Sequence, residues 1–392
     1  MDITLLVIDS FGIGAMPDAG AYGDSGANTA LHICEHETGK KWPFLQKLGL
    51  GNASKILGPD LPGCEAAANP LASFGVMAER SPGKDTTTGH WELAGVLLDK
   101  PFPTFPPEYP SFPEELIEAF TNRTGRGVLG NYAASGTVII QDLGDEHIAT
   151  GKPIVYTSSD SVFQIAAHEE VIPVEELYEI CEITRELCDS YQVGRVIARP
   201  FIGSSGGYTR TERRRDFSMP PAAETVLDRL SAHGVETVGV GKIGDIFCER
   251  GIETSHHDKG NAACLKRTLS LLQEKTSRDR FIFVNLVDTD MIYGHRRDVT
   301  GYMNAVAEID SALPELISRM NDDDSLIISA DHGCDPTFAG TDHTREYVPL
   351  LWYSANRPPA DLGIRRQFCD VAATAAMLFG LRDPMNGISL FL

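Results

Sequence analysis

The chain has 392 residues, 42% of them hydrophobic and 23% charged, which is typical of a soluble protein with a large core and a smaller second domain. Asp and Glu total 55 against 34 Lys and Arg, so the formal net charge of -21 disfavours nucleic acids and anionic membranes as partners. The sequence contains no secretory signal pattern, no apolar stretch of the ~20 residues that a membrane span needs, and no CxxC pair among its eight cysteines. We expect a cytoplasmic monomer with reduced thiols.

Short apolar runs that end beside polar residues predict buried, parallel strands. These runs are residues 3–8, 235–240, 281–287, 325–330 and 348–353. Helical patterns at about 222–233, 261–274, 301–319 and 368–379 separate or follow them. The alternation of strands and helices predicts an α/β fold with a mostly parallel central sheet flanked by helices.

The middle of the chain has a different character. Residues 101–113 are rich in proline and aromatic side chains, and a Gly- and Pro-rich stretch at 203–221 closes the interval. Helices are expected at 114–121 and 173–188, and strands at 154–158 and 195–199. We therefore predict an inserted α+β domain at 101–218 and a discontinuous core formed by 1–100 and 219–392.

Acidic and histidine side chains stand just past several predicted strands. Asp9 ends the first run, and others follow the runs that end near residues 287 and 330. These later residues are Asp288, Asp290, His295, Asp331, His332, Asp342 and His343. The carboxyl ends of parallel strands share one crevice, and mixed carboxylate and imidazole donors suit Mn²⁺ or Zn²⁺ rather than Ca²⁺. Each residue alone is equally well explained as a helix cap, loop carboxylate or buried imidazole, but their joint position favours a metal site.

A polar segment, residues 83–92, leads toward a helix and contains three successive threonines. A hydroxyl at a helix N-terminus can meet an oxyanion bound by backbone N–H groups, and a coordinated metal turns it into a usable nucleophile. Taken alone, these threonines are more typical of caps and turns.

Several motifs together resemble the phosphopentomutase family of the alkaline phosphatase superfamily. They are Asp9 to Gly14 (DSFGIG), Gly83 to Glu92 (GKDTTTGHWE), Val287 to Asp290 (VDTD), Gly294 to Asp298 (GHRRD), Asp331 to Gly333 (DHG) and Gly340 to Glu346 (GTDHTRE). The inserted interval adds Tyr156 to Ser161 and Gly194 to Pro200, so the resemblance covers essentially the whole chain. The chain departs from the family pattern at Thr289, where Phe is expected, and at residues 131–136.

The resemblance implies an alkaline-phosphatase-like catalytic core, a cap domain that sets substrate specificity, and Thr86 as the nucleophile that becomes phosphothreonine. It assigns one Mn²⁺ to Asp9, Thr86, Asp331 and His332, and a second to Asp290, His295 and His343, with Asp288 as a neighbour. It assigns contacts with the sugar phosphate to Ser158, Asp160, Arg195, Ile197, Arg210 and Lys242. The implied substrates are ribose and deoxyribose 1- and 5-phosphates, and the implied activator is glucose 1,6-bisphosphate or ribose 1,5-bisphosphate.

Three alternatives stay open at this point. A phosphatase or phosphodiesterase of the same superfamily would use the same metals, and a cofactor-independent phosphoglycerate mutase would show a serine nucleophile and a longer chain. A metal-stabilised binding protein would hold metal without forming covalent phosphate on any threonine. Residues 239–244 match GxGxxG after a predicted strand, but the polar, irregular segment that follows argues against a dinucleotide site.

Overall fold

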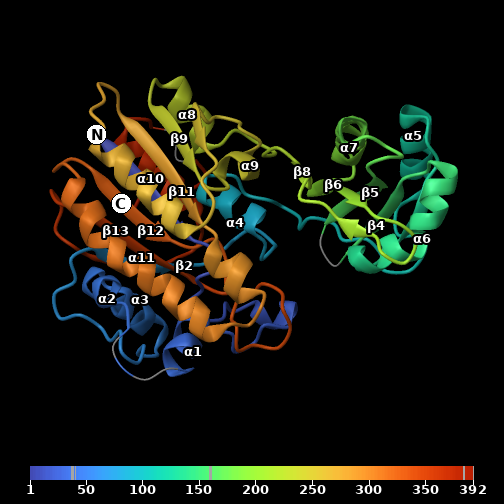
Figure 1. The fold of residues 1–392 in the computed structure, drawn as a ribbon. Helices are drawn as coiled ribbons and strands as arrows, with labels where there is room; N and C mark the ends of the chain where they lie inside the picture. Colours follow the sequence, from blue (N-terminus) through green and yellow to red (C-terminus); the bar gives the residue numbers. More distant parts are fainter. Residues whose placement is uncertain (37–38, 40, 159–160, 383–384, 392) are drawn as a thin grey trace. The chain divides into compact units, whose positions relative to one another are not determined.

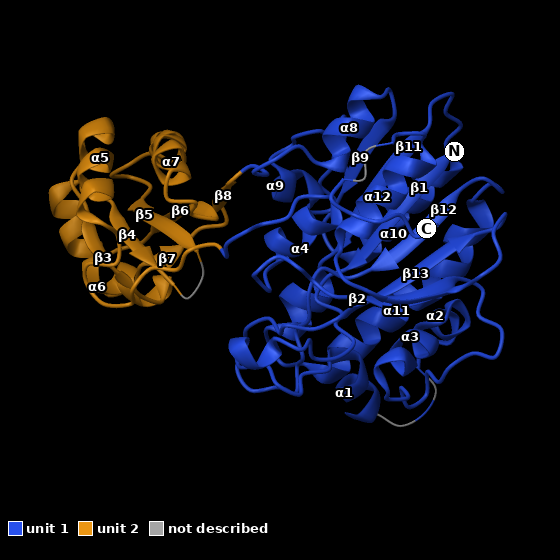
Figure 2. Cartoon of the chain, turned by 180° about the vertical axis from the view of Figure 1, so that it is seen from behind, with its two compact units in different colours: residues 1–101, 220–392 blue, residues 102–219 orange. Residues whose placement is uncertain are grey.

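The computed structural model describes residues 1–36, 39, 41–158, 161–382 and 385–391. The chain divides into two compact units: unit 1 comprises Met1–Pro101 and Pro220–Leu392, and unit 2 comprises Phe102–Met219 (Figure 2). These limits lie one residue from those that the Pro- and Gly-rich stretches predict.

Unit 1 is built on an eight-stranded sheet in the order β10-β9-β11-β1-β12-β13-β2-β14 (Figure 1). The strands are β1 Asp2–Ile8, β2 Ser73–Met77, β9 Glu236–Val240, β10 Thr254–His256, β11 Arg280–Leu286, β12 Ser325–Ser329, β13 Val348–Ser354 and β14 Asp361–Arg365. Neighbouring strands run parallel except at β13, which is antiparallel to both β12 and β2. The predicted mostly parallel α/β sheet is therefore confirmed.

The first strand lies at the centre of this sheet. All residues of β1 are buried, and it pairs in parallel with β11 on one side and β12 on the other. Ile3, for example, stands opposite Phe281 and Ser325. A strand covered on both faces needs a continuous apolar run rather than alternation, which is why residues 3–8 lack a polar face.

The helices of unit 1 form two groups that flank the sheet (Figures 1 and 2). One group comprises α1 Thr29–His36, α2 Pro43–Leu48, α3 Leu50–Leu57, α10 Asn261–Gln273 and α11 Val299–Arg319. The other comprises α4 Thr86–Leu93, α8 Val226–Ala232, α9 Ile243–Phe247 and α12 Cys369–Leu378. A short 3-10 helix, η1 Ala19–Tyr22, and a π-helix, η2 Thr289–Gly294, lie in loops. Within the described residues, every helix is too short or too polar to cross a bilayer.

Unit 2 has its own sheet in the order β3-β4-β5-β6-β7, with β8 paired to β6. Its strands are β3 Leu129–Ala133, β4 Ile154–Thr157, β5 Val162–His168, β6 Arg195–Ile202, β7 Thr209–Arg210 and β8 Arg215–Ser218. Its helices are α5 Glu114–Thr124, α6 Gly136–Thr150 and α7 Val174–Asp189. The sequence predicted α5, α7, β4 and β6 but missed α6 and the strands β3, β5, β7 and β8.

Two apolar clusters cover opposite faces of the unit 2 sheet. Val155 of β4 packs in one cluster with Leu116 of α5 and Leu177 of α7. The adjacent Ile154 and Tyr156 pack in the other cluster with side chains of α6 and β6. Successive strand residues point to opposite faces, so this alternation gives unit 2 a core of its own.

Candidate active site

The candidate metal-binding side chains meet at the carboxyl ends of three neighbouring strands of unit 1. Asp9 follows β1, Asp331 follows β12, and Asp290 lies in η2, just after β11. Because β11, β1 and β12 are adjacent and parallel, residues about 280 and 320 positions apart in sequence reach one edge of the sheet. The predicted convergence is therefore present for all three carboxylates.

One group of donors surrounds the Nε2 atom of His332. This nitrogen lies 3.3 Å from Asp331 Oδ2 and 3.6 Å from Asp9 Oδ1. It also lies 3.2 Å from the hydroxyl oxygen of Thr86, the first residue of α4. Asp85 caps that helix by accepting a hydrogen bond from the backbone N–H of Thr88, so the Thr86 side chain sits at a fixed helix start.

A second group of donors forms around Asp290. His343 Nε2 lies 3.3 Å from Asp290 Oδ1, and His295 Nε2 lies 3.4 Å from Asp290 Oδ2. The two histidine Nε2 atoms are 3.2 Å apart. The rings of His332 and His343 stack with centroids 3.9 Å apart, so the two groups are contiguous.

Backbone carbonyls set the orientation of two of these histidines. His295 Nδ1 lies 2.6 Å from the carbonyl oxygen of Thr341, and His332 Nδ1 lies 3.0 Å from that of Gly333. In the neutral ring, a proton on each Nδ1 would donate to its carbonyl and leave a lone pair on Nε2, the form that binds a metal.

The pKa values of the carboxylates and histidines in the two groups are shifted by burial and by one another. Burial, together with the Asp331 carboxylate, raises the pKa of Asp9. Burial acts in the same direction on Asp290, but the charge of His343 and the hydrogen bond of His295 outweigh it and hold the pKa of Asp290 well below its usual range. The hydrogen bond to Asp290 also raises the pKa of His295 to about 9.

Two buried oxygens test whether a metal fits. Asp9 Oδ1 and Asp290 Oδ1 have no hydrogen-bond partner among the described residues, although a histidine nitrogen lies near each. Carboxylate oxygens and imidazole lone pairs facing one another at such distances repel unless a cation stands between them. Three sets of donors, whose atoms lie within 4.8 Å of one another in each set, meet this requirement. They are Asp9, Asp331 and His332; Asp290, His332 and His343; and Asp290, His295 and Cys334.

The contacts around these groups include residues that the motif analysis did not single out. His90 Nδ1 lies 2.9 Å from the Thr86 carbonyl oxygen and 3.0 Å from Asp331 Oδ2. Asn285 Nδ2 lies 3.0 Å from His90 Nε2 and donates to Asp9 Oδ2 at 2.8 Å. His90 lies inside the 83–92 motif, which is the signal that could have identified it; Asn285 lies within a buried strand and gave none.

Arg345 fixes the loop that precedes Thr86. Its guanidinium, 3% exposed, donates to the backbone oxygens of Ser81 and Gly83 at 2.9 and 2.6 Å. It also contacts both the carboxylate and the backbone oxygen of Glu79, at 2.6 and 2.8 Å. The loop between β12 and β13, which contains Arg345, is thereby tied to the segment that carries the candidate nucleophile.

The residues expected to contact the sugar phosphate are divided between the units. Lys242 of unit 1 precedes α9, and its charge acts on Asp9. In unit 2, Ser158 follows β4, and Arg195 and Ile197 lie on β6. Arg210 on β7 donates to the hydroxyl of Tyr156 at 3.0 Å. Asp160 lies outside the described residues, so its expected contact stays a prediction.

Asp288 has a separate structural role. Its Oδ2 accepts a hydrogen bond of 2.7 Å from the backbone N–H of Asn261, the first residue of α10. It therefore sits at a helix start and belongs to none of the three sets of converging donors.

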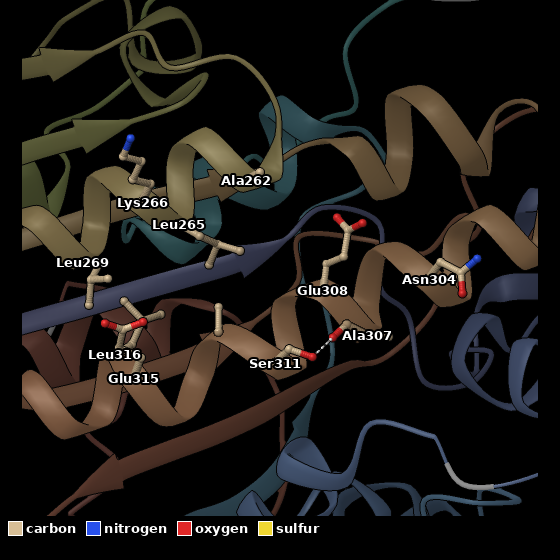
Figure 3. A pocket seen from close by; sticks show the side chains of 11 residues that line it. Ala262, Leu265, Lys266, Leu269, Asn304, Ala307, Glu308, Ser311, Glu315 and Leu316 are labelled. Carbon is tan, nitrogen blue, oxygen red and sulfur yellow. Dashed lines mark hydrogen bonds between the residues drawn. The ribbon is translucent and has the colours of Figure 1, made fainter.

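A groove of about 840 Å³ lies elsewhere, between α10 and α11 (Figure 3). Leu265, Leu269 and Leu316 line it, with Lys266 and Glu308 among its polar side chains. None of the candidate site residues contributes to this lining.

Comparison with known proteins first places the chain in a class of metalloenzymes. A family model described as "Metalloenzyme superfamily" matches residues 1–383, and with this donor set it supports divalent metal binding. A phosphopentomutase of Caldanaerobacter subterraneus subsp. tengcongensis is 53% identical over 391 residues, covering 99% of this chain and 96% of the relative. A phosphopentomutase of Thermotoga maritima is 51% identical over 392 residues, covering 99% and 98%. The chain belongs to the phosphopentomutase family, as its motifs predicted.

Removal of metal is expected to destabilise unit 1, because the buried Asp9 Oδ1 and Asp290 Oδ1 then lose the cation that offsets their negative charge. All three tryptophans, at 42, 91 and 352, lie in unit 1, so their fluorescence follows its unfolding. Mn²⁺ at a hundredfold excess over its Kd should raise the thermal midpoint of chelated protein by about 5 °C or more. Asp290→Asn should reduce this gain, whereas substitution of the exposed Asp99 by Asn should leave it unchanged. Equal midpoints with and without Mn²⁺ would contradict the assignment.

Proposed function

We propose that this chain interconverts ribose or deoxyribose 1-phosphate and the corresponding 5-phosphate, with Thr86 as the residue that carries the phosphoryl group. The observation that carries the proposal is the position of the Thr86 hydroxyl, 3.2 Å from His332 Nε2. That nitrogen also lies 3.6 Å from Asp9 Oδ1 and 3.3 Å from Asp331 Oδ2. Relatives named phosphopentomutase, 51–53% identical over nearly the whole chain, support the choice of reaction.

The proposed ligands of two divalent ions, taken to be Mn²⁺, are the two contiguous groups. Asp9, Thr86, Asp331 and His332 would hold one ion, and Asp290, His295 and His343 the other. Ions bound there supply charge that lowers the pKa of the Thr86 hydroxyl and stabilises the oxygens of the transferred group. Local cations of this kind offset the chain's net charge of -21, which otherwise repels a phosphate ester.

The proposed cycle begins with phosphorylated Thr86. Its phosphoryl group passes to the 5-hydroxyl oxygen of a pentose 1-phosphate, the Thr86 Oγ–P bond breaks, the hydroxyl proton goes to Thr86 Oγ, and a 1,5-bisphosphate forms. The O1–P bond then breaks as the phosphoryl group at position 1 passes to Thr86 Oγ, and the Thr86 proton goes to O1. The 5-phosphate leaves and phosphothreonine is restored. The α4 N-terminus holds the Thr86 Oγ in place through both steps, so little protein reorganisation is needed.

We assign sugar recognition to Lys242 in unit 1 and, in unit 2, to Ser158, Asp160, Arg195, Ile197 and Arg210. Arg210 supports this assignment because its guanidinium Nε is buried without a hydrogen-bond partner among the described residues, which favours an anionic ligand. Unit 2 would act as a cap that excludes water, since water in the site would convert the mutase into a phosphatase. A trace of glucose 1,6-bisphosphate or ribose 1,5-bisphosphate would prime Thr86, and the enzyme would act as a cytoplasmic monomer.

The test follows two products at once. Protein purified with Mn²⁺ receives α-ribose 1-phosphate and a trace of glucose 1,6-bisphosphate, and both ribose 5-phosphate and free phosphate are measured. The proposal predicts 5-phosphate formation with little free phosphate. Release of phosphate as fast as isomerisation would instead support a phosphatase, and metal binding without either product would support a binding protein.

A further inference from the structure

Cys334 lies beside the Asp290 group, although the sequence gave it no role there. Its side chain is 1% exposed, and its sulfur, an oxygen of Asp290 and a ring nitrogen of His295 all lie within 4.8 Å of one another. The sulfur packs on Gly294 so closely that a Cβ added there would lie 2.9 Å from it. A weak contact of 3.8 Å joins the sulfur to the Asp342 carbonyl oxygen.

The backbone of Cys334 is fixed. Its N–H lies 3.0 Å from the carbonyl oxygen of Ser10 and 3.2 Å from the hydroxyl oxygen of Thr29. These contacts hold the residue against the segment that follows β1, so the position of the sulfur beside Asp290 does not depend on a free loop.

A second observation at this position points to a ligand. Asp290 is 6% exposed, and its Oδ1 has no hydrogen-bond partner among the described residues. His295 Nε2 and His343 Nε2 face each other at 3.2 Å next to this carboxylate. A cation bound by Asp290 and His295 lies within reach of Cys334 Sγ, because the sulfur belongs to one set of mutually close donor atoms with these two residues.

We infer that Cys334 is an additional ligand that binds soft divalent cations, such as Cd²⁺ and Zn²⁺, at the Asp290 position. This inference rests on the proposed ligand set of Asp290, His295 and His343. The sulfur–metal bond forms as the thiol proton leaves to solvent. Thiolate sulfur favours Cd²⁺ and Zn²⁺, whereas Mn²⁺ favours oxygen and nitrogen, so Mn²⁺ leaves the sulfur uncoordinated.

The number of coordination positions left open at the Asp290 site therefore differs between Mn²⁺ and the softer cations. With Mn²⁺ and three protein ligands, coordination positions stay open for phosphoryl oxygens. With Cd²⁺ or Zn²⁺, the sulfur of Cys334 occupies a position that Mn²⁺ leaves open for such an oxygen. Soft cations are therefore expected to bind tightly at this position and to block it.

The test compares Cys334→Ser with Cys248→Ser, because Cys248 is an exposed thiol and the obvious place for adventitious Cd²⁺. Metal-free full-length protein is titrated with Cd²⁺ while thiolate-to-cadmium charge-transfer absorption is recorded in the ultraviolet. Wild type and Cys248→Ser should show the band, and Cys334→Ser should lack it and bind Cd²⁺ about tenfold or more weakly. Mn²⁺ affinity, followed by electron paramagnetic resonance, should change by less than about twofold in Cys334→Ser.

Retention of the band in Cys334→Ser would overturn the inference, and so would an equal loss of Mn²⁺ and Cd²⁺ affinity, which would indicate a structural role. Neither readout involves turnover. Failure of the mutase assay with Mn²⁺ would therefore contradict the proposed function without affecting the cadmium result.

Discussion

Thr86→Ala is expected to abolish isomerisation, with turnover reduced at least about 10³-fold, because the variant lacks the oxygen that accepts the phosphoryl group. Metal content should stay near that of wild type, since six of the seven proposed ligand side chains remain. Incubation with glucose 1,6-bisphosphate should add the mass of one phosphoryl group to wild type and none to the variant. Intact-protein mass spectrometry and elemental analysis measure the two effects separately.

Thr87→Ala is the matched control, since Thr87 is the neighbouring threonine in the same first turn of α4. It makes the same change in size and helix propensity but leaves the hydroxyl beside His332 in place. This control should retain the phosphoryl adduct and most of the turnover. Wild-type turnover in Thr86→Ala, or loss of the adduct in Thr87→Ala alone, would show that the nucleophile is misassigned.

Arg345→Met is expected to lower the free energy of unfolding of unit 1 by about 3–5 kcal/mol, because Glu79 would lose the guanidinium that faces its buried carboxylate. Both side chains of the pair are almost fully buried, at 3% and 2% exposed. The backbone oxygens of Ser81 and Gly83 would lose their donors as well, so Thr86 would be less firmly placed and kcat should fall. Denaturant unfolding followed by tryptophan fluorescence measures the first effect, and the mutase assay measures the second.

The double variant Glu79→Gln with Arg345→Met separates charge from positioning. It removes the uncompensated carboxylate and should recover part of the stability, whereas kcat should stay low because the contacts to Ser81 and Gly83 are still missing. Arg319→Met, which breaks an exposed pair with Glu315, should cost less than about 1 kcal/mol. A similar small loss in Arg345→Met would contradict the argument.

The central sheet was largely predictable because its strands are buried on both faces. Residues 3–8 and 281–287 form continuous apolar runs, and the structure has strands at Asp2–Ile8 and Arg280–Leu286. The antiparallel direction of β13 was not predictable, since its apolar pattern is the same for either direction. Helix α6 was missed because Ile139 and Ile140 are followed by a mixed polar segment with Gly144, which weakens helical periodicity.

The meeting of the candidate site residues was predictable where these residues are adjacent in sequence or end a strand. Asp331 and His332 are adjacent in sequence, and Asp9 ends a strand, so strand order alone suggests their meeting. Arg345 lies inside the motif at residues 340–346, but that motif gave no role to it, and Cys334 lies outside the motifs. Their positions depend on the path of the loop between β12 and β13, which folds back so that Gly333 and Thr344 pair as a short bridge. Such a path follows from tertiary contacts rather than from any local pattern.

The central place of β1 has a consequence for synthesis on the ribosome. Both strand partners of residues 2–8, β11 and β12, emerge more than 270 residues after them. The nascent chain therefore carries an unpaired apolar segment throughout that interval, a state that favours chaperone binding and slows folding. Because His343 emerges later still, the proposed set of ligands is complete only after residue 343 has been synthesised.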